Sequence, residues 1–194
     1  MKKIMFNDRY GLTQAVLHGR KTMTRRLITC PREFKGEWVA GFSIHKYKGG
    51  RGTEVWMHDA DEAIMDGGQL LPKYKVGEVV AIAQAYNELD IFRPYPVPAG
   101  WTNKMFVKAD LMPHRLQITA VKVERLQEIS DEDCLKEGIC AYLPHYFYDY
   151  EGSNDYGFNT PREAFAALID KVSGKGTWNS NPWVWAYEFQ LLRD

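Results

Sequence analysis

The amino-acid sequence predicts an α+β fold, in which a curved, mostly antiparallel β-sheet or small barrel packs against about three helices. Three observations carry this prediction. Residues 115–125 and 183–191 are the longest segments with alternating apolar side chains, a pattern typical of strands. Residues 130–138 and 160–174 each begin with helix-capping residues and end at a glycine. The length of 194 residues suits a single domain.

The first predicted element is a short helix over residues 12–19. Leu12, Ala15 and Val16 recur at helical spacing, and Gly19 stands where a left-handed residue would end the helix. The basic run GRKTMTRR follows directly. Residues 36–72 are rich in glycine and have no sustained period, so we expect an insertion that leaves the core and contains a short hairpin.

The middle of the chain predicts strands separated by a long loop. Residues 79–86 are apolar on both faces, as in a buried strand, and residues 91–100 contain three prolines, which favour a surface loop. Residues 104–109 are predicted to form another strand. Within residues 115–125 the apolar phase changes after Ala120, which indicates a β-bulge of the kind that curved sheets use.

Two helices and a final strand follow. Ser130 and Asp133 form a capping box for a helix that should end at Gly138. Thr160 begins the second helix, with a proline at its first position. The final strand alternates large apolar residues, and Trp183 and Trp185 at its start are expected in the core.

A long aromatic loop over residues 140–159 separates those two helices. Its aromatic side chains have no single period, and we expect most of them to pack against the sheet rather than to stack on bases. They are Tyr142, Tyr146, Phe147, Tyr148, Tyr150, Tyr156 and Phe158.

The net charge of zero conceals two segments of opposite sign. Residues 1–35 carry nine basic and two acidic side chains, a net +7, and residues 128–170 carry ten acidic and two basic ones, a net −8. This segregation argues against a long nucleic-acid duplex as partner but leaves room for a local anion site. No segment has the roughly 18 apolar residues that span a bilayer, and no signal peptide is evident, so we expect a cytoplasmic protein without a membrane partner.

The cysteines and histidines predict no metal site and no cofactor. Cys30, Cys134 and Cys140 form no C-x-x-C pair, and the five histidines lack the spacing that places two ligands on one helical face. We expect the three cysteines to be small buried apolar residues. A divalent ion held by carboxylates and water remains an alternative, since such a site needs no spacing pattern.

The basic run at residues 19–26 is the segment best suited to bind an anion. Arg20, Arg25 and Arg26 are the candidate substrate-binding residues. Repulsion among four cations in seven residues predicts a lowered pKa for Lys21, towards a value useful for a base. In an extended chain Lys21 and Thr24 point to opposite sides, so they would meet only if the backbone turned.

The same run resembles the G-x-K-x-x-[E/T]-x-R signature of the ASCH superfamily, whose PUA-like β-barrel binds nucleic acids and modified bases. Residues 75–78 (KVGE), 118–139 and 181–185 (NPWVW) are similar to further blocks of the superfamily, in the same order. The last block is similar to the longer members found in phages and bacterial mobile elements. The resemblance implies one PUA-like domain over residues 1–194.

One branch of this superfamily, the bacterial N4-acetylcytidine amidohydrolases, has Thr in place of the motif Glu and uses a Lys, a Thr and a Glu in catalysis. The resemblance implies Lys21, Thr24 and Glu137 as catalytic residues, with Glu132 as a weaker substitute for Glu137. Lys21 would take the proton of Thr24, whose hydroxyl attacks the acetyl carbonyl, or the trio would activate a water molecule. Glu137 would orient the lysine or carry a proton.

The expected partner is a nucleoside or a short single-stranded RNA. Two alternatives remain open at the level of sequence. One is a non-catalytic module that binds RNA or a modified base. The other is a metal-dependent ribonuclease, for which Glu132, Asp133 and Glu137 offer carboxylates.

Overall fold

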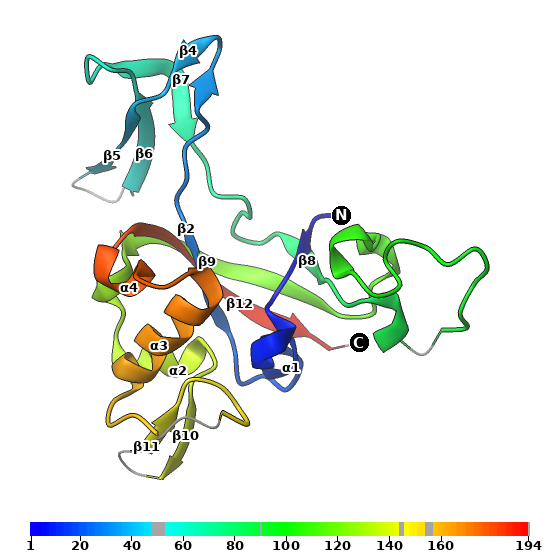
Figure 1. The fold of residues 1–194 in the computed structure, drawn as a ribbon. Helices are drawn as coiled ribbons and strands as arrows, with labels where there is room; N and C mark the ends of the chain where they lie inside the picture. Colours follow the sequence, from blue (N-terminus) through cyan, green and yellow to red (C-terminus); the bar gives the residue numbers. More distant parts are fainter. Residues whose placement is uncertain (48–52, 90, 144–145, 154–156, 194) are drawn as a thin grey trace.

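The computed structural model describes residues 1–47, 53–89, 91–143, 146–153 and 157–193 (Figure 1). The fold is α+β with mostly antiparallel sheets, as predicted. Its centre is a five-stranded sheet in the order β1-β8-β9-β12-β2. These strands are β1 (Lys3–Ile4), β8 (Val79–Ile82), β9 (Arg115–Arg125), β12 (Trp183–Leu192) and β2 (Met23–Leu27). β1 and β8 pair in parallel, and the other neighbours are antiparallel.

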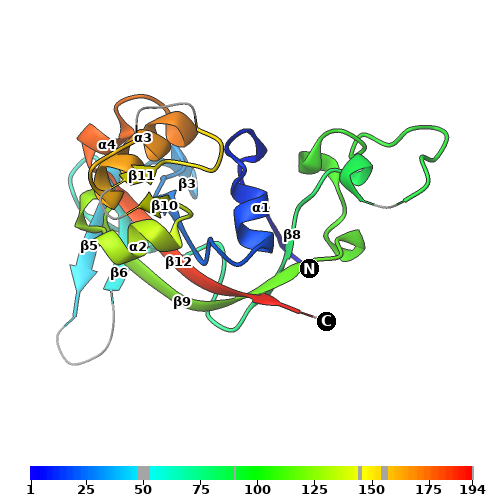
Figure 2. The same ribbon diagram turned by 90° about the horizontal axis from the view of Figure 1, so that it is seen from below.

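The central sheet does not close into a barrel within the described residues, because β1 and β2 remain as two unpaired edges. The long strands β9 and β12 curve strongly, as Figure 2 shows. Arg26 of β2 reaches the segment after β1, where its Nη2 donates to the Met5 carbonyl at 2.5 Å. β1 has only two residues, so few main-chain groups are present there for β2 to pair with. The two edges are joined by the Arg26 side chain instead.

The predicted bulge is present in the β9–β12 pair. Ala120 lies opposite Glu188 and Ile118 lies opposite Phe189, so that Thr119 has no partner on β12. The bulge falls within one or two residues of the phase change in the sequence. A bulge of this kind bends the strand and increases its twist.

The described residues form four α-helices rather than about three. They are α1 (Leu12–Leu17), α2 (Asp131–Lys136), α3 (Pro161–Ser173) and α4 (Thr177–Ser180). The predicted N-caps are confirmed: the Ser130 hydroxyl accepts from the Asp133 amide, and the Thr160 hydroxyl accepts from the Glu163 amide. The reciprocal half of the predicted capping box at Ser130 is absent among the described residues, because the Asp133 carboxylate binds Arg25 and Lys122 instead. The additional helix, α4, has four residues, which are too few to show a helical period.

The prediction of a strand over residues 104–109 is wrong. This segment contains the 3-10 turns η3 (Lys104–Phe106) and η4 (Ala109–Leu111). The Asn103 side chain caps η3, and the Lys3 amine binds the carbonyls of Met105 and Val107, both at 2.6 Å. Side chains therefore satisfy main-chain groups that a strand would have paired. β8 is also shorter than predicted, and the 3-10 turn η2 (Tyr86–Glu88) occupies its expected end.

The insertion at residues 36–72 is more regular than the short hairpin expected. β3 (Glu33–Phe34) and β4 (Glu37–Trp38) pair with each other, and β5 (Gly41–Lys46), β6 (Thr53–His58) and β7 (Ile64–Leu70) form a separate antiparallel sheet. Val39, Met57 and Met65 form its own small core. This sheet projects from the main body in Figure 1 and contacts it at β12, where the Lys46 amine lies 5.7 Å from the centre of the Trp183 ring. Residues 48–52 of the insertion lie outside the described residues.

The aromatic segment at residues 140–159 forms a hairpin of β10 (Cys140–Leu143) and β11 (Tyr146–Tyr148). Phe147, Tyr150 and Phe158 pack against the main core, whereas Tyr142 and Tyr146 are exposed. The packing expectation is therefore confirmed for three of these side chains. Tyr156, with residues 144–145 and 154–155, lies outside the described part of the chain.

The main core lies between the central sheet and the helices. Its large buried side chains include Leu116, Ile118, Phe165 and Tyr187. Cys134 belongs to this core, where burial raises the pKa of its thiol to about 12. The other two cysteines are only half-buried, contrary to expectation. In the described ranges, no helix combines the length and apolar character needed to cross a membrane.

Candidate active site

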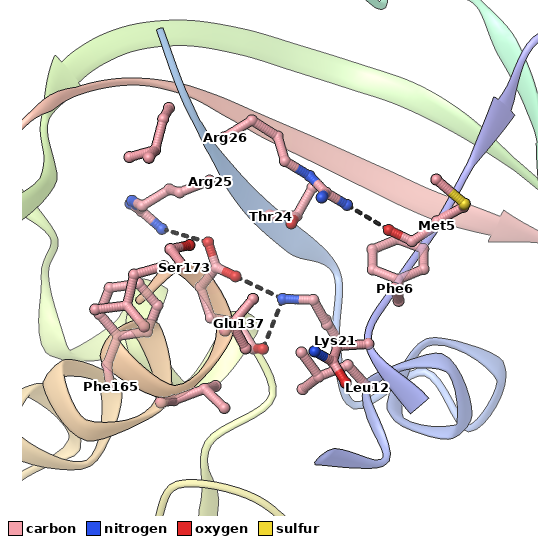
Figure 3. Close-up of a pocket in the computed structure, with 15 residues that line it drawn as sticks. Met5, Phe6, Leu12, Lys21, Thr24, Arg25, Arg26, Glu137, Phe165 and Ser173 are labelled. Carbon is pink, nitrogen blue, oxygen red and sulfur yellow. Dashed lines mark hydrogen bonds and ion pairs between the residues drawn. The ribbon is translucent and has the colours of Figure 1, made fainter. Parts of the chain in front are cut away.

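A cavity of about 470 Å³ opens where the edge strand β2 meets the end of α2, the helix α3 and the segment after β1 (Figure 3). Cavities of this size typically bind small molecules. Its polar wall contains Lys21, Thr24, Arg25, Arg26 and Glu137, and its apolar wall includes Phe6, Leu12, Phe165, Leu168 and Ile169. The structure therefore places four predicted site residues from the basic run around one cavity with Glu137.

Lys21 and Glu137 form a buried ion pair at the base of this cavity. The Lys21 amine donates to Glu137 Oε2 at 2.5 Å and to the Glu137 main-chain carbonyl at 2.7 Å. Their side chains are 2% and 5% exposed. Gly138, with φ at +101°, follows the end of α2, and a Cβ there would lie 3.4 Å from Lys21 Cβ. That contact is an ordinary one, so glycine is favoured here by its positive φ, which residues with side chains rarely adopt.

Burial lowers the pKa of Lys21 and is the largest cause of the shift. Glu137 opposes it, through its charge and its hydrogen bond. The charges of Arg26 and Arg25 lower the pKa further, by smaller amounts. The predicted direction is thus correct, but desolvation contributes more than the repulsion between neighbouring cations on which the prediction was based.

Arg25 lies behind Glu137 and ties it to two further carboxylates. Its guanidinium contacts Glu124 at 2.6 Å, Asp133 at 2.9 Å and Glu137 at 3.2 Å, and its side chain is 1% exposed. Glu137 therefore uses one carboxylate oxygen for Lys21 and the other for Arg25. Because both oxygens are held, the orientation of the carboxylate is defined before any ligand binds.

Asp133, one of the carboxylates around Arg25, has a lowered pKa. Burial alone would raise the pKa of Asp133, but hydrogen bonds and charges from Lys122 and Arg25 outweigh it and lower the pKa. Burial would likewise lower the pKa of Arg25, and Glu137 and Glu124 raise it instead. Sequence analysis missed Glu124 as a partner of Arg25, since no local pattern links two residues 99 positions apart.

Thr24 reaches the same cavity from the other face of β2. Thr24 pairs with Tyr187 and Arg26 with Trp185 across the sheet, whereas Arg25 pairs with Ala186. Because β2 is an edge strand, the cavity extends around it, and side chains from both of its faces line the wall (Figure 3). The Thr24 hydroxyl has no hydrogen-bond partner among the described residues, so it is available to a ligand.

The remaining predicted residues lie in different surroundings. Arg20 does not line the cavity, because its guanidinium pairs with Glu151 at 2.5 Å. Arg26 is exposed and pairs with no carboxylate in the described part of the chain. Glu132 is exposed and pairs with Lys136 at 3.0 Å, so Glu137 is the better placed of the two candidate glutamates.

No group of three or more His, Cys, Asp or Glu side chains suited to a metal ion is found within the described residues. Near the cavity, Glu124, Asp133 and Glu137 are all paired with Lys or Arg. As placed here, these carboxylates neutralise cations of the protein itself.

Comparison of the chain with protein-family models, with curated proteins and with solved structures finds no match.

Proposed function

We propose that the protein is an ASCH-superfamily amidohydrolase with an opened PUA-like barrel, and that it removes the acyl group from an N4-acetylcytidine-like nucleoside. One observation carries the proposal: a buried Lys21–Glu137 pair, 2.5 Å between Nζ and Oε2, shares a nucleoside-sized cavity with the unpartnered hydroxyl of Thr24. A lysine of lowered pKa and an unpartnered hydroxyl that line one cavity are the two groups that general-base activation of a nucleophile requires, and the proposed reaction needs the ligand-bound state to bring them within hydrogen-bond distance.

In the proposed reaction, neutral Lys21 accepts the proton of the Thr24 hydroxyl while the oxygen attacks the acetyl carbonyl. The amide C–N bond then breaks, and the Lys21 ammonium returns the proton to the leaving cytosine nitrogen. Water hydrolyses the resulting acetyl ester on Thr24, so that one water molecule is consumed and acetate is released. Glu137 holds the Lys21 amine in place throughout.

The walls of the cavity suit such a ligand. Met5, Leu27 and Val172 are the exposed apolar residues of the lining and provide surface for a base. The exposed Arg26 provides a donor for the developing oxyanion. The reaction as written needs no cofactor. We propose a cytoplasmic nucleoside or short single-stranded RNA as the substrate.

The experiment is conversion of N4-acetylcytidine to cytidine, followed by mass spectrometry. Lys21→Ala, Thr24→Ala and Glu137→Gln should each lower kcat/KM by about 10²-fold or more, the range expected for loss of a general base or nucleophile. Lys75→Ala is the matched control, because this exposed lysine lines none of the cavities near the site. Full activity in all three site variants would reject the assignment.

The same assay separates the mechanism from its alternatives. A Thr24 acetyl ester trapped at low pH identifies the threonine as nucleophile, whereas activity in Thr24→Ala points to an activated water. Cleavage of labelled single-stranded RNA that stops with EDTA would favour the ribonuclease. Binding of RNA without any turnover would favour the non-catalytic module.

A further inference from the structure

A second cavity, of about 340 Å³, lies next to the candidate active site. Met5, Arg26 and Leu27 line both cavities, so the Arg26–Met5 bridge between the sheet edges is a wall that they share. Lys3, Lys73, Tyr74, Trp185 and Tyr187 are among the other residues that line it. An elongated ligand could therefore occupy both cavities and contact Arg26 between its two halves.

The second cavity carries uncompensated positive charge. Lys3, Arg26 and Lys73 line it, no Asp or Glu does, and none of the three forms an ion pair with a carboxylate in the described ranges. The Lys3 amine is held by two main-chain carbonyls, and the Lys73 amine lies 5.5 Å from the centre of the Tyr74 ring. Because Met105 and Val107 do not line the cavity, the Lys3 amine points away from it, and the charges that face it are those of Arg26 and Lys73. Two cations without acidic partners attract an anion such as a phosphate.

Aromatic rings form the other part of this wall. Tyr74 and Tyr187 are buried and meet edge to face, with ring centres 5.4 Å apart. The Tyr187 hydroxyl accepts from the Lys73 amide, and the Tyr74 hydroxyl donates to the Lys3 carbonyl, so both rings fix the cationic segments in place. Trp185 is only half-buried and also lines a third cavity, beside Val121 and Val123. A partly open indole next to cations is suited to stack on a base.

We propose that the second cavity binds the phosphate and the adjoining base of a nucleotide linked to the one in the active site. On this view the protein acts on a nucleotide within a short single-stranded oligonucleotide rather than on a free nucleoside. The phosphodiester lies against Arg26 and Lys73, and the second base stacks on Trp185. This inference rests on the proposed function, because it places the reacting base in the first cavity.

The test is equilibrium binding of three unacetylated probes: cytidine, cytidine 3′-monophosphate and the dinucleotide CpA. Affinity should rise from the nucleoside to the monophosphate and again to the dinucleotide, by about three- to tenfold at each step, as expected for one charge-assisted contact and then one stacked base. The affinity of the dinucleotide should fall as salt rises, because phosphate contacts release counterions. Equal affinities for monophosphate and dinucleotide would overturn the second-base assignment.

Lys73→Ala and Lys75→Ala are a matched pair, because both lysines are exposed and lie two positions apart, but only Lys73 lines the cavity. Lys73→Ala should lower the affinity for the monophosphate and for the dinucleotide by about three- to tenfold and leave the affinity for cytidine unchanged. Trp185→Leu should weaken the dinucleotide alone. Equal effects of Lys73→Ala and Lys75→Ala on the dinucleotide would overturn the proposal.

Turnover assays separate this proposal from the proposed function. Binding of the dinucleotide that depends on Lys73, without hydrolysis of its acetylated form, would retain the second site and reject the amidohydrolase. Hydrolysis of acetylcytidine and of the acetylated dinucleotide with equal kcat/KM, unaffected by Lys73→Ala, would retain the amidohydrolase and reject the second site.

Discussion

Arg25 and Arg26 are neighbours in the sequence, yet β2 turns them towards different surroundings. Arg25 faces α2, is 1% exposed and contacts three carboxylates. Arg26 faces the gap between the sheet edges, is exposed and pairs with none within the described residues. A buried cation must be neutralised, because leaving its charge unpaired in a low-dielectric interior costs several kcal/mol. An exposed cation is hydrated and remains available to bind a ligand.

The difference assigns the two arginines separate roles. We assign Arg25 a positioning role in the proposed reaction, because its side chain is 1% exposed and holds Glu137. Arg26 lines both cavities and is the better candidate for contact with substrate. The sequence-based prediction had placed both in the same substrate-binding group.

The largest expected effect is the difference in unfolding free energy between the Arg25 and Arg26 variants. Arg25→Ala should lower the free energy of unfolding by about 3–5 kcal/mol, because it leaves three buried carboxylates without their shared cation. Arg26→Ala should change it by less than about 1 kcal/mol, as is usual for exposed charges. Urea denaturation of both variants measures the contrast. Similar losses of unfolding free energy in the two variants would show that burial does not distinguish the contributions of Arg25 and Arg26 to stability.

Glu137→Gln should cost less than Arg25→Ala, about 1–3 kcal/mol, the range for a hydrogen-bonded charge replaced by a neutral isostere. Lys21 relieves part of the cost by losing its proton, because Glu137 is the group that raises its pKa. The pKa of Lys21 is lower in the folded protein than in the unfolded chain. At any pH between these two pKa values, Lys21 is therefore more protonated in the unfolded chain than in the folded protein. The free energy of unfolding should therefore rise with pH across that interval. Glu137→Gln lowers the folded pKa of Lys21 further, so the interval is wider and the total rise is larger in the variant.

Urea midpoints measured from neutral pH to pH 10 check the previous prediction. Lys21→Met provides the control, since it removes the titrating group and should flatten the dependence. A slope that persists in Lys21→Met would assign the titration to another residue.

Asp133→Asn should have a smaller effect, about 1–2 kcal/mol at neutral pH, because Arg25 keeps two other carboxylates. The folded pKa of Asp133 is lowered, so its contribution is present above the ordinary value near 4 and is lost as pH falls through the folded value. Acid titration of stability should therefore be shallower in Asp133→Asn than in the wild type. An unchanged acid transition would contradict this account.

The smallest expected effect concerns the pH–rate profile of the proposed hydrolysis. Activity should rise as pH rises through the lowered pKa of Lys21, because the neutral amine is the base. Arg26→Ala removes a charge that lowers this pKa, so the rising limb should move to higher pH. Arg20→Ala is the control and should leave the limb in place, since Arg20 is paired with Glu151. A shift of the limb to lower pH in Arg26→Ala would contradict the assignment of Lys21 as the base.

Much of the local structure could be predicted because its causes lie within a few residues. The caps at Ser130 and Thr160 depend on amides three positions away, and the alternation in β9 and β12 follows from the two-residue repeat of a strand. The prediction for residues 104–109 was wrong for the complementary reason. Two of its main-chain carbonyls accept hydrogen bonds from the amine of Lys3, about 100 positions earlier in the chain.

By itself the sequence determined where α2 and α3 begin, the bulge and the basic run that contributes Lys21 and Thr24. Only the tertiary structure decided which cations of that run are neutralised and which are open to a ligand. The carboxylates that hold Arg25 come from 99 to 112 positions away, and Glu137 lies 116 positions from Lys21. Ion pairs of this separation leave no periodic signal in the chain. Their formation depends on the curvature that brings an edge strand against the end of α2.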